Sequence, residues 1–324
     1  MSIQSKLILP GAVLSTFFLS GCGGGVSDAP EEAAGSVIPD EPAAAIETIT
    51  KELAAGNGGI LWEAMPVSYQ SDVNKIARLA GSKVDAEIYN KVFELVGRVI
   101  EVADKQKEFI FNAQLGGPQS EEEVGKMRTA WPSVVGFLRT LKTSSLASTA
   151  GLQAFDGKSF CEETVSELIK YAEDISTISG EELPLSAYNN VVIKALESTE
   201  TSATLEITAP DGSVETEDFT KVDNRWVPAE MAGEWSTSIA NATEQLTAMD
   251  PEQMAQNKPQ IMGVFTMIDG VLTQIEVAET QEQFDQAIQG AMMPLMGLMM
   301  MKQGMVAPSP APEIPAAPEL PVAP

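Results

Sequence analysis

The chain has 324 residues, of which 44% are apolar, and its 46 acidic and 20 basic side chains give a formal net charge of −26. That length is sufficient for one large domain or two small ones. The negative charge repels phosphate backbones and anionic headgroups, so we expect no binding to nucleic acid. The chain contains no histidine, which excludes Ser-His and Cys-His catalytic pairs and every histidine-ligated metal site.

A short apolar segment at the amino terminus predicts export. It follows the positive charge of Lys6 and extends over residues 7–19, which is shorter than the roughly 20 apolar residues that span a bilayer. The segment ends in Leu19-Ser20-Gly21-Cys22, which has the form of a bacterial lipobox. Residues 1–21 are therefore expected to be a lipoprotein signal peptide that is removed before Cys22.

Cys22, the new amino terminus, is the expected lipid attachment site. Two or more acyl chains on this residue would hold the protein stably on a membrane, which predicts a lipid-anchored protein of the cell envelope. In bacterial lipoproteins, which this segment resembles, an Asp after the cysteine often retains the protein at the inner membrane. Gly23 stands at that position, so the outer membrane is favoured over the inner membrane. Residues 22–45 are rich in Gly, Ala, Pro and acids and are expected to form a flexible tether.

Helical periodicity predicts a block of helices after this tether. Asp85 is an expected N-cap, and the apolar residues that follow recur at helical spacing: Ile88, Tyr89, Val92, Phe93, Val96, Val99, Ile100 and Ala103. Ser120 with Glu123 has the form of a capping box, and Ser159 with Glu162 repeats it. We therefore expect helices to start at each of these three places.

The pattern changes to strand-like alternation between about residues 188 and 227. Leu205 and Ile207 alternate with polar residues, and Asp211-Gly212 is a strong hairpin signal because it supplies positive φ cheaply. The return strand is expected over 214–222, followed by a turn at Asp223-Asn224. With residues 191–196 this predicts three or four antiparallel strands, one face of which packs on helices.

Helices are expected again beyond Pro228. Asp250-Pro251 combines an N-cap acid with Pro at the first helical position, and Thr280 with Gln283 is expected to cap a final helix. Residues 306–324 form a Pro/Ala-rich tail with no packing pattern. The predicted fold class is α+β, predominantly helical with a small three- to four-stranded antiparallel sheet, in one domain over residues 46–305.

Two stretches resemble known families. Residues 202–228 (SATLEITAPDGSVETEDFTKVDNRWVP) resemble the closing meander of cystatin-like and nuclear transport factor 2-like (NTF2-like) lipoprotein domains, in which a DG hairpin precedes a strand ending in Lys/Arg-Trp. Residues 64–93 (AMPVSYQSDVNKIARLAGSKVDAEIYNKVF), together with the Met-rich end, are similar to uncharacterised planctomycete-type bacterial lipoproteins. That family has no assigned activity, so the resemblance implies a location and an α+β fold.

The catalytic chemistry left open by the sequence is restricted to carboxylates, since two acids with separated pKa values can act as acid and base. No pair stands out among the 46 acids, and we expect a non-catalytic protein without a cofactor or metal. Cys161 has no disulfide partner once Cys22 is acylated. It lies either in the first turn of a helix, where a thiol can be activated, or in the core as an inert thiol.

A Met-rich segment near the carboxyl terminus is the second unusual feature. The segment includes Met292, and Met293, Met296 and Met299 are spaced to share one helical side. Such a side can fill an irregular core gap, form an adaptable contact surface or, through soft thioethers, bind Cu(I). Trp226 is an apolar anchor that could line a ligand cavity. These five residues are the candidate contacts for a ligand or partner.

The function predicted from these features is that of a non-catalytic cell-envelope lipoprotein, serving as a structural or interaction component. Its partners are the membrane, through acylated Cys22, and another envelope protein. The alternative is a module that binds an apolar small molecule or lipid in a pocket between the sheet and the helices.

Overall fold

The computed structural model describes residues 38–113, 120–180 and 184–290, and it shows an α+β fold that is predominantly helical. The longer helices are α2 (Pro42–Ala54), α4 (Val67–Lys83), α5 (Ala86–Lys105), α7 (Glu121–Thr143), α10 (Ser166–Ser179), α11 (Ala229–Thr247) and α12 (Pro251–Glu276). Shorter helices are α3 (Gly59–Ala64), α6 (Lys107–Asn112), α8 (Thr149–Gln153) and α9 (Gly157–Ser159), with 3-10 turns at η1 (Ser145–Ala147) and η3 (Leu185–Asn190) and a π-helical turn at η2 (Phe160–Val165). Residues 281–290 are also helical.

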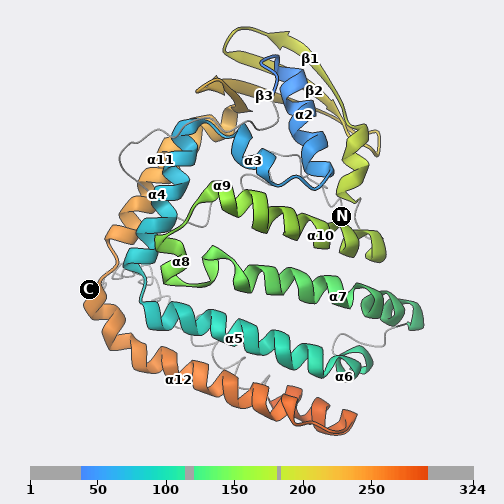
Figure 1. The fold of residues 1–324 in the computed structure, drawn as a ribbon, viewed down its shortest axis with the longest axis vertical. Coiled ribbons are helices and arrows are strands. Elements are labelled where there is room, and N and C mark those ends of the chain that lie inside the picture. The colour runs from blue at the N-terminus through green and yellow to red at the C-terminus, as the bar shows by residue number, and fades with distance from the viewer. Residues whose placement is uncertain (1–37, 114–119, 181–183, 291–324) are drawn as a thin grey trace, which may run out of the picture.

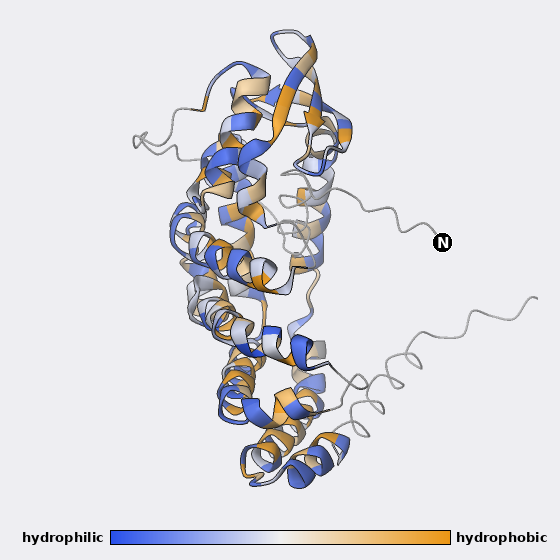
Figure 2. Ribbon diagram, turned by 90° about the vertical axis from the view of Figure 1, so that its right-hand side faces the viewer, coloured by the Kyte–Doolittle hydropathy of each residue, from blue (hydrophilic) through white to orange (hydrophobic). Residues whose placement is uncertain are grey.

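The molecule consists of a sheet at one end and a stack of helices that extends away from it. Helices α10, α7, α5 and α12 lie side by side in that order, and α4 and α11 run across one end of them (Figure 1). Turned by 90°, the molecule is long and narrow (Figure 2). Much of the helical part is therefore a single layer, so that its helices have two open sides. None of the described helices is both long enough and apolar enough to cross a bilayer.

The sheet is antiparallel, with strand order β1 (Val192–Ser198), β2 (Ser202–Thr208), β3 (Val214–Val222) and β4 (Arg225–Pro228). Leu205 and Ile207 are fully buried, as their alternation predicts, and Gly212 has the positive φ of a hairpin turn. Residues 185–190 form η3, so the sheet begins at Val192 rather than near residue 188. The inner face of the sheet packs on α2, α3 and η2 in one core, whose members include Ala45, Ile49, Ile60, Trp62, Cys161, Leu205, Ile207, Phe219 and Trp226.

Three of the predicted helix starts are confirmed. The carboxylate of Asp85 accepts from the amides of Glu87 and Ile88 at 3.0 Å. Ser120 and Glu123 form a reciprocal capping box at the start of α7. The carboxylate of Asp250 accepts from the amide of Glu252 at 2.9 Å, with Pro251 at the first position of α12.

The capping box expected at Ser159 and Glu162 is wrong. The N-cap is Asp156, whose carboxylate accepts from the amide of Ser159 at 3.1 Å and from its hydroxyl at 2.7 Å. Ser159 is already helical and its hydroxyl is engaged by that acid. The chain beyond it widens into the π-helical turn η2, against which Gly58 packs so closely that a Cβ there would lie 2.6 Å from the carbonyl oxygen of Cys161.

The first described helix begins inside the range expected for the tether. α2 starts at Pro42, four residues before residue 46, because the carboxylate of Glu41 accepts from the amides of Ala43 and Ala44 and caps it. Ala45 is then buried in the core beneath the sheet. The signal peptide, most of the tether and the Pro/Ala-rich tail lie outside the described residues.

Candidate functional site

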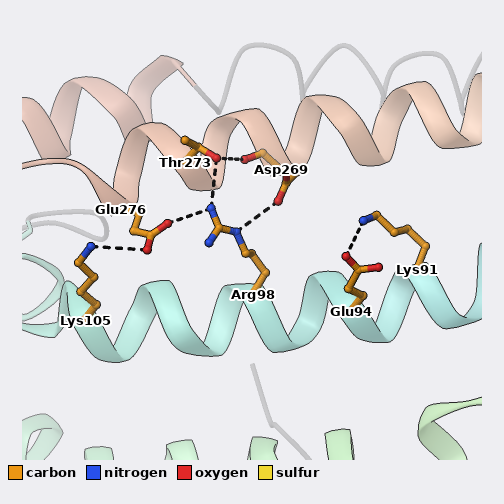
Figure 3. A network of polar contacts seen from close by, with 7 residues as sticks. All are labelled: Lys91, Glu94, Arg98, Lys105, Asp269, Thr273 and Glu276. Carbon is orange, nitrogen blue, oxygen red and sulfur yellow. Dashed lines mark hydrogen bonds and ion pairs between the residues drawn. The ribbon is translucent and has the colours of Figure 1, made fainter.

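A network of charged side chains joins α5 to α12, the outermost helix of the layer. Arg98 on α5 contacts Asp269 at 3.3 Å, Glu276 at 2.9 Å and the hydroxyl of Thr273 at 3.2 Å (Figure 3). Lys105 reaches the carboxylate of Glu276 at 3.5 Å. Because partly exposed ion pairs each contribute little, this network specifies how α12 is placed rather than supplying most of its stability.

Both ends of the same pair of helices are also joined. Lys258, near the start of α12, contacts Asp85 at 3.0 Å and Glu87 at 2.7 Å, at the start of α5. At the other end, the buried amide of Gln106 donates to the carbonyl oxygens of Ile275, Glu276 and Ala278 at 2.8–3.1 Å. Helix α12 therefore runs parallel to α5 along the full length of α5.

The opposite side of α5 faces α7. A Cβ on Gly97 would lie 2.9 Å from the side chain of Lys142, and Asp104 accepts hydrogen bonds from Trp131 at 3.3 Å and from Arg139 at 3.0 Å. These pairs show that α7 is antiparallel to α5. With α12 on one side and α7 on the other, two sides of α5 are left without a neighbouring helix of the layer.

These two open sides of α5 differ in polarity. One carries Asn90, Glu94 and Glu101, all exposed. The other carries Val92, Val96, Val99 and Ala103, which recur at helical spacing on a single face. Val92 is 39% exposed and Val99 is 44% exposed. A stripe of valines thus lies open where a solvated helix would ordinarily carry polar residues.

The neighbouring helices continue this apolar side. Ser133 and Gly136 of α7 meet Asp174 and Tyr171 of α10, which fixes the orientation of α7. Because the helices are right-handed and their orientations are set by these contacts, Val134 and Leu138 of α7 and Val264 and Ile268 of α12 lie on the same side of the layer as Val99. We call the following set the apolar face: Val92, Val96, Val99, Ala103, Val134, Leu138, Val264 and Ile268.

Trp226, which was singled out from the sequence, lies apart from the apolar face. Trp226 is buried beneath the sheet, where its indole N–H donates to the carbonyl oxygen of Asp40 at 2.7 Å and its ring lies 5.4 Å from the ammonium of Lys221. It is part of the core of the sheet. Cys22, Met292, Met293, Met296 and Met299 lie outside the described residues.

Two groups with catalytic potential, Glu217 and Cys161, have raised pKa values. Burial raises the pKa of Glu217, and the nearby Glu215 and Glu230 add to this shift. Burial also raises the pKa of the Cys161 thiol to about 12, with Glu162 contributing, so this thiol has the character of a core residue. Within the part of the chain that the structure describes, no three acidic or cysteine side chains are grouped as a metal site requires.

Sequence reasoning named the valines of α5 as helical but missed the face they form. The spacing of these valines was a sufficient signal for an apolar stripe. Which side of α5 stays open depends on α12 and α7, whose contacting residues, such as Asp269 and Lys142, are distant from α5 in the chain. No signal identified Gln106 or Arg98 as contacts of α12. No protein-family model, no curated protein and no solved structure matches this chain.

Proposed function

We propose that this protein is a lipid-anchored, non-catalytic component of the cell envelope that acts by binding another envelope protein. The lipobox ending in Cys22 supports the anchor and the location. The folded part supports an interaction role, because apolar side chains of α5 and α7 are exposed on one side of the helical layer.

The apolar face carries this proposal. Val92, Val99 and Leu138 are each more than a third exposed, although they lie on the long helices that form the middle of the layer. Contiguous apolar surface of this kind is typical of protein contact sites. The opposite side of α5 carries Glu94 and Glu101 and serves as an internal reference for an ordinary solvated surface.

The interaction is tested by placing a photoreactive amino acid at Val99 or at Glu101 in the full-length protein within its own cells. These positions are two residues apart on α5, on opposite open sides. We expect Val99 to crosslink to one discrete envelope protein and Glu101 to give no such product. Equal labelling from both positions, or none from either, would contradict the proposed function.

The anchor is tested separately. Cys22→Ser removes the thiol that receives the acyl chains, so the variant should move from the membrane fraction to the soluble fraction of the envelope. Separation of the two membranes should place the unaltered protein in the outer membrane. An unmodified, freely soluble chain that begins at residue 1 would contradict this location.

The alternative function, binding of an apolar small molecule or lipid between sheet and helices, is tested by native mass spectrometry of the full-length protein. Trp226 was the residue expected to line that pocket, and it is engaged in core packing and in the hydrogen bond to Asp40. A bound lipid that is lost on Trp226→Leu would favour this alternative over the interaction role.

A further inference from the structure

One end of the apolar face is already covered by the last described segment. In residues 281–290, the hydroxyl of Thr280 accepts from the amide of Gln283 at 3.3 Å, which caps the helix. Phe284 is 1% exposed and its ring lies 5.8 Å from that of Phe109. Ala287 and Ile288 pack on the same apolar cluster, which also holds Leu95, Val102, Phe265, Ile268, Val271, Leu272 and Ile275.

The direction of this helix points the chain toward the open part of the face. The amide of Gln281 donates to the carbonyl oxygen of Phe109 at 3.1 Å, beyond the carboxyl end of α5. α12 ends at Glu276. Because Phe284 and Ile288 pack in one cluster with Phe265 of α12, residues 281–290 lie back against α12. Ile288 packs in the same cluster as Phe265 and Ile268, well inside α12. The described chain therefore ends on the side of the layer on which Val92 and Val99 are exposed.

The sequence that follows has the composition such a surface requires. Residues 291–301 contain no charged side chain. In the sequence, the spacing of Phe284 and Ile288 is continued by Met292, Leu295 and Met299. Residues 291–305 are fifteen residues long, whereas the seven helical steps from Val92 to Val99 span about 10 Å.

We propose that the Met-rich segment, residues 291–305, docks on the apolar face of its own chain and covers Val92, Val99 and Leu138. Flexible thioether side chains fit an irregular surface of valines and leucines. The inference goes beyond the proposed function and does not rest on it, because the segment can occupy the face whether or not a partner exists. A partner that binds there must displace it.

Paired cysteines in the full-length protein test the docking. Val99→Cys with Met296→Cys should form an intramolecular crosslink with a short bismaleimide, several-fold more than Glu101→Cys with Met296→Cys. The two pairs differ in which open side of α5 carries the thiol. Equal yields from both pairs would overturn the proposal. Crosslinks that join two chains would also overturn it, by showing that a second copy occupies the face.

A second measurement does not depend on crosslinking. Met292→Asp with Met296→Asp should release the segment and raise the fluorescence of a hydrophobic dye several-fold. Ala311→Asp with Ala317→Asp adds the same charge to the Pro/Ala-rich tail and should leave the fluorescence unchanged. Unchanged fluorescence in the first variant would overturn the docking. If the docking is overturned in this way but Val99 still crosslinks to a partner protein, the proposed function stands.

Discussion

The amide of Gln106 should be the most sensitive point in the placement of α12. Its two N–H groups are shared among three carbonyl oxygens at the end of that helix, those of Ile275, Glu276 and Ala278. Gln106→Met keeps the length and helix preference of the side chain and removes both donors. The carbonyl of Ile275 still accepts from the amide of Ala278 at 3.2 Å. The buried carbonyl of Ala278 therefore loses its donor, whereas water can reach the carbonyl of Glu276.

A buried acceptor left without a partner costs about 1–3 kcal/mol. One such acceptor, the carbonyl of Ala278, gives an expected loss of about 1–3 kcal/mol in the free energy of unfolding. For a domain of this size, that loss lowers the melting temperature by roughly 2–12 °C. The loss should be largest at the end of α12, because that is where the hydrogen bonds are made.

Denaturant unfolding with hydrogen exchange by mass spectrometry checks this prediction. Amides over residues 272–278 should exchange faster in Gln106→Met, while those of the sheet should not change. Gln289→Met, at an exposed position, is the matched control and should be neutral. A loss of less than about 0.5 kcal/mol, the range of ordinary surface substitutions, would refute the role assigned to Gln106.

Three further predictions concern the core and the sheet. Burial raises the pKa of Glu217, so the folded state holds its proton more tightly than the unfolded chain and stability is lost as pH rises through the folded pKa. Glu217→Gln should therefore melt at a higher temperature than the unaltered protein at pH 7, and this difference should vanish in acid. The same difference in melting temperature at pH 7 and in acid, or none at pH 7, would contradict the prediction. A Cβ on Gly58 would lie 2.6 Å from two backbone atoms, so Gly58→Ala should cost about 1–3 kcal/mol. Gly233→Ala, where the space is open in α11, should instead stabilise by about 0.5–1 kcal/mol, and equal effects in calorimetry would refute the close approach at Gly58. Cys161, with its raised pKa of about 12, should resist iodoacetamide at pH 8 in the folded protein and react fully in denaturant.

The local elements were largely predictable because their determinants are neighbours in the chain. Alternation around Leu205, the Asp211-Gly212 turn and the caps at Asp85 and Asp250 each depend on a few consecutive residues, and all are confirmed. The failure at Ser159 has a local cause as well. The carboxylate of Asp156 accepts from the amide of Ser159, which Glu162 was expected to engage. Asp156, three residues upstream, is therefore the N-cap in place of Ser159.

The arrangement of the layer could not be predicted. Arg98 and Asp269 are 171 residues apart, and a charged residue on a helix has many partners available in so acidic a chain. The apolar residues of α5 occupy more than half of its circumference, so periodicity alone could not separate the buried Leu95 and Ile100 from the exposed Val92 and Val99. The apolar face is defined by the positions of α7 and α12 around α5, and these depend on contacts between distant parts of the chain.

The parallel course of α5 and α12 has a consequence for how the protein assembles. A parallel neighbour cannot follow through a tight reversal, so the chain completes α7, α10, the sheet and α11 before α12 returns to lie beside Arg98. Contacts between such distant segments form slowly. The side of α5 that carries Leu95 and Val102 therefore stays exposed to solvent during synthesis until the final quarter of the polypeptide is made. A nascent chain stopped before residue 250 exposes that side to other proteins.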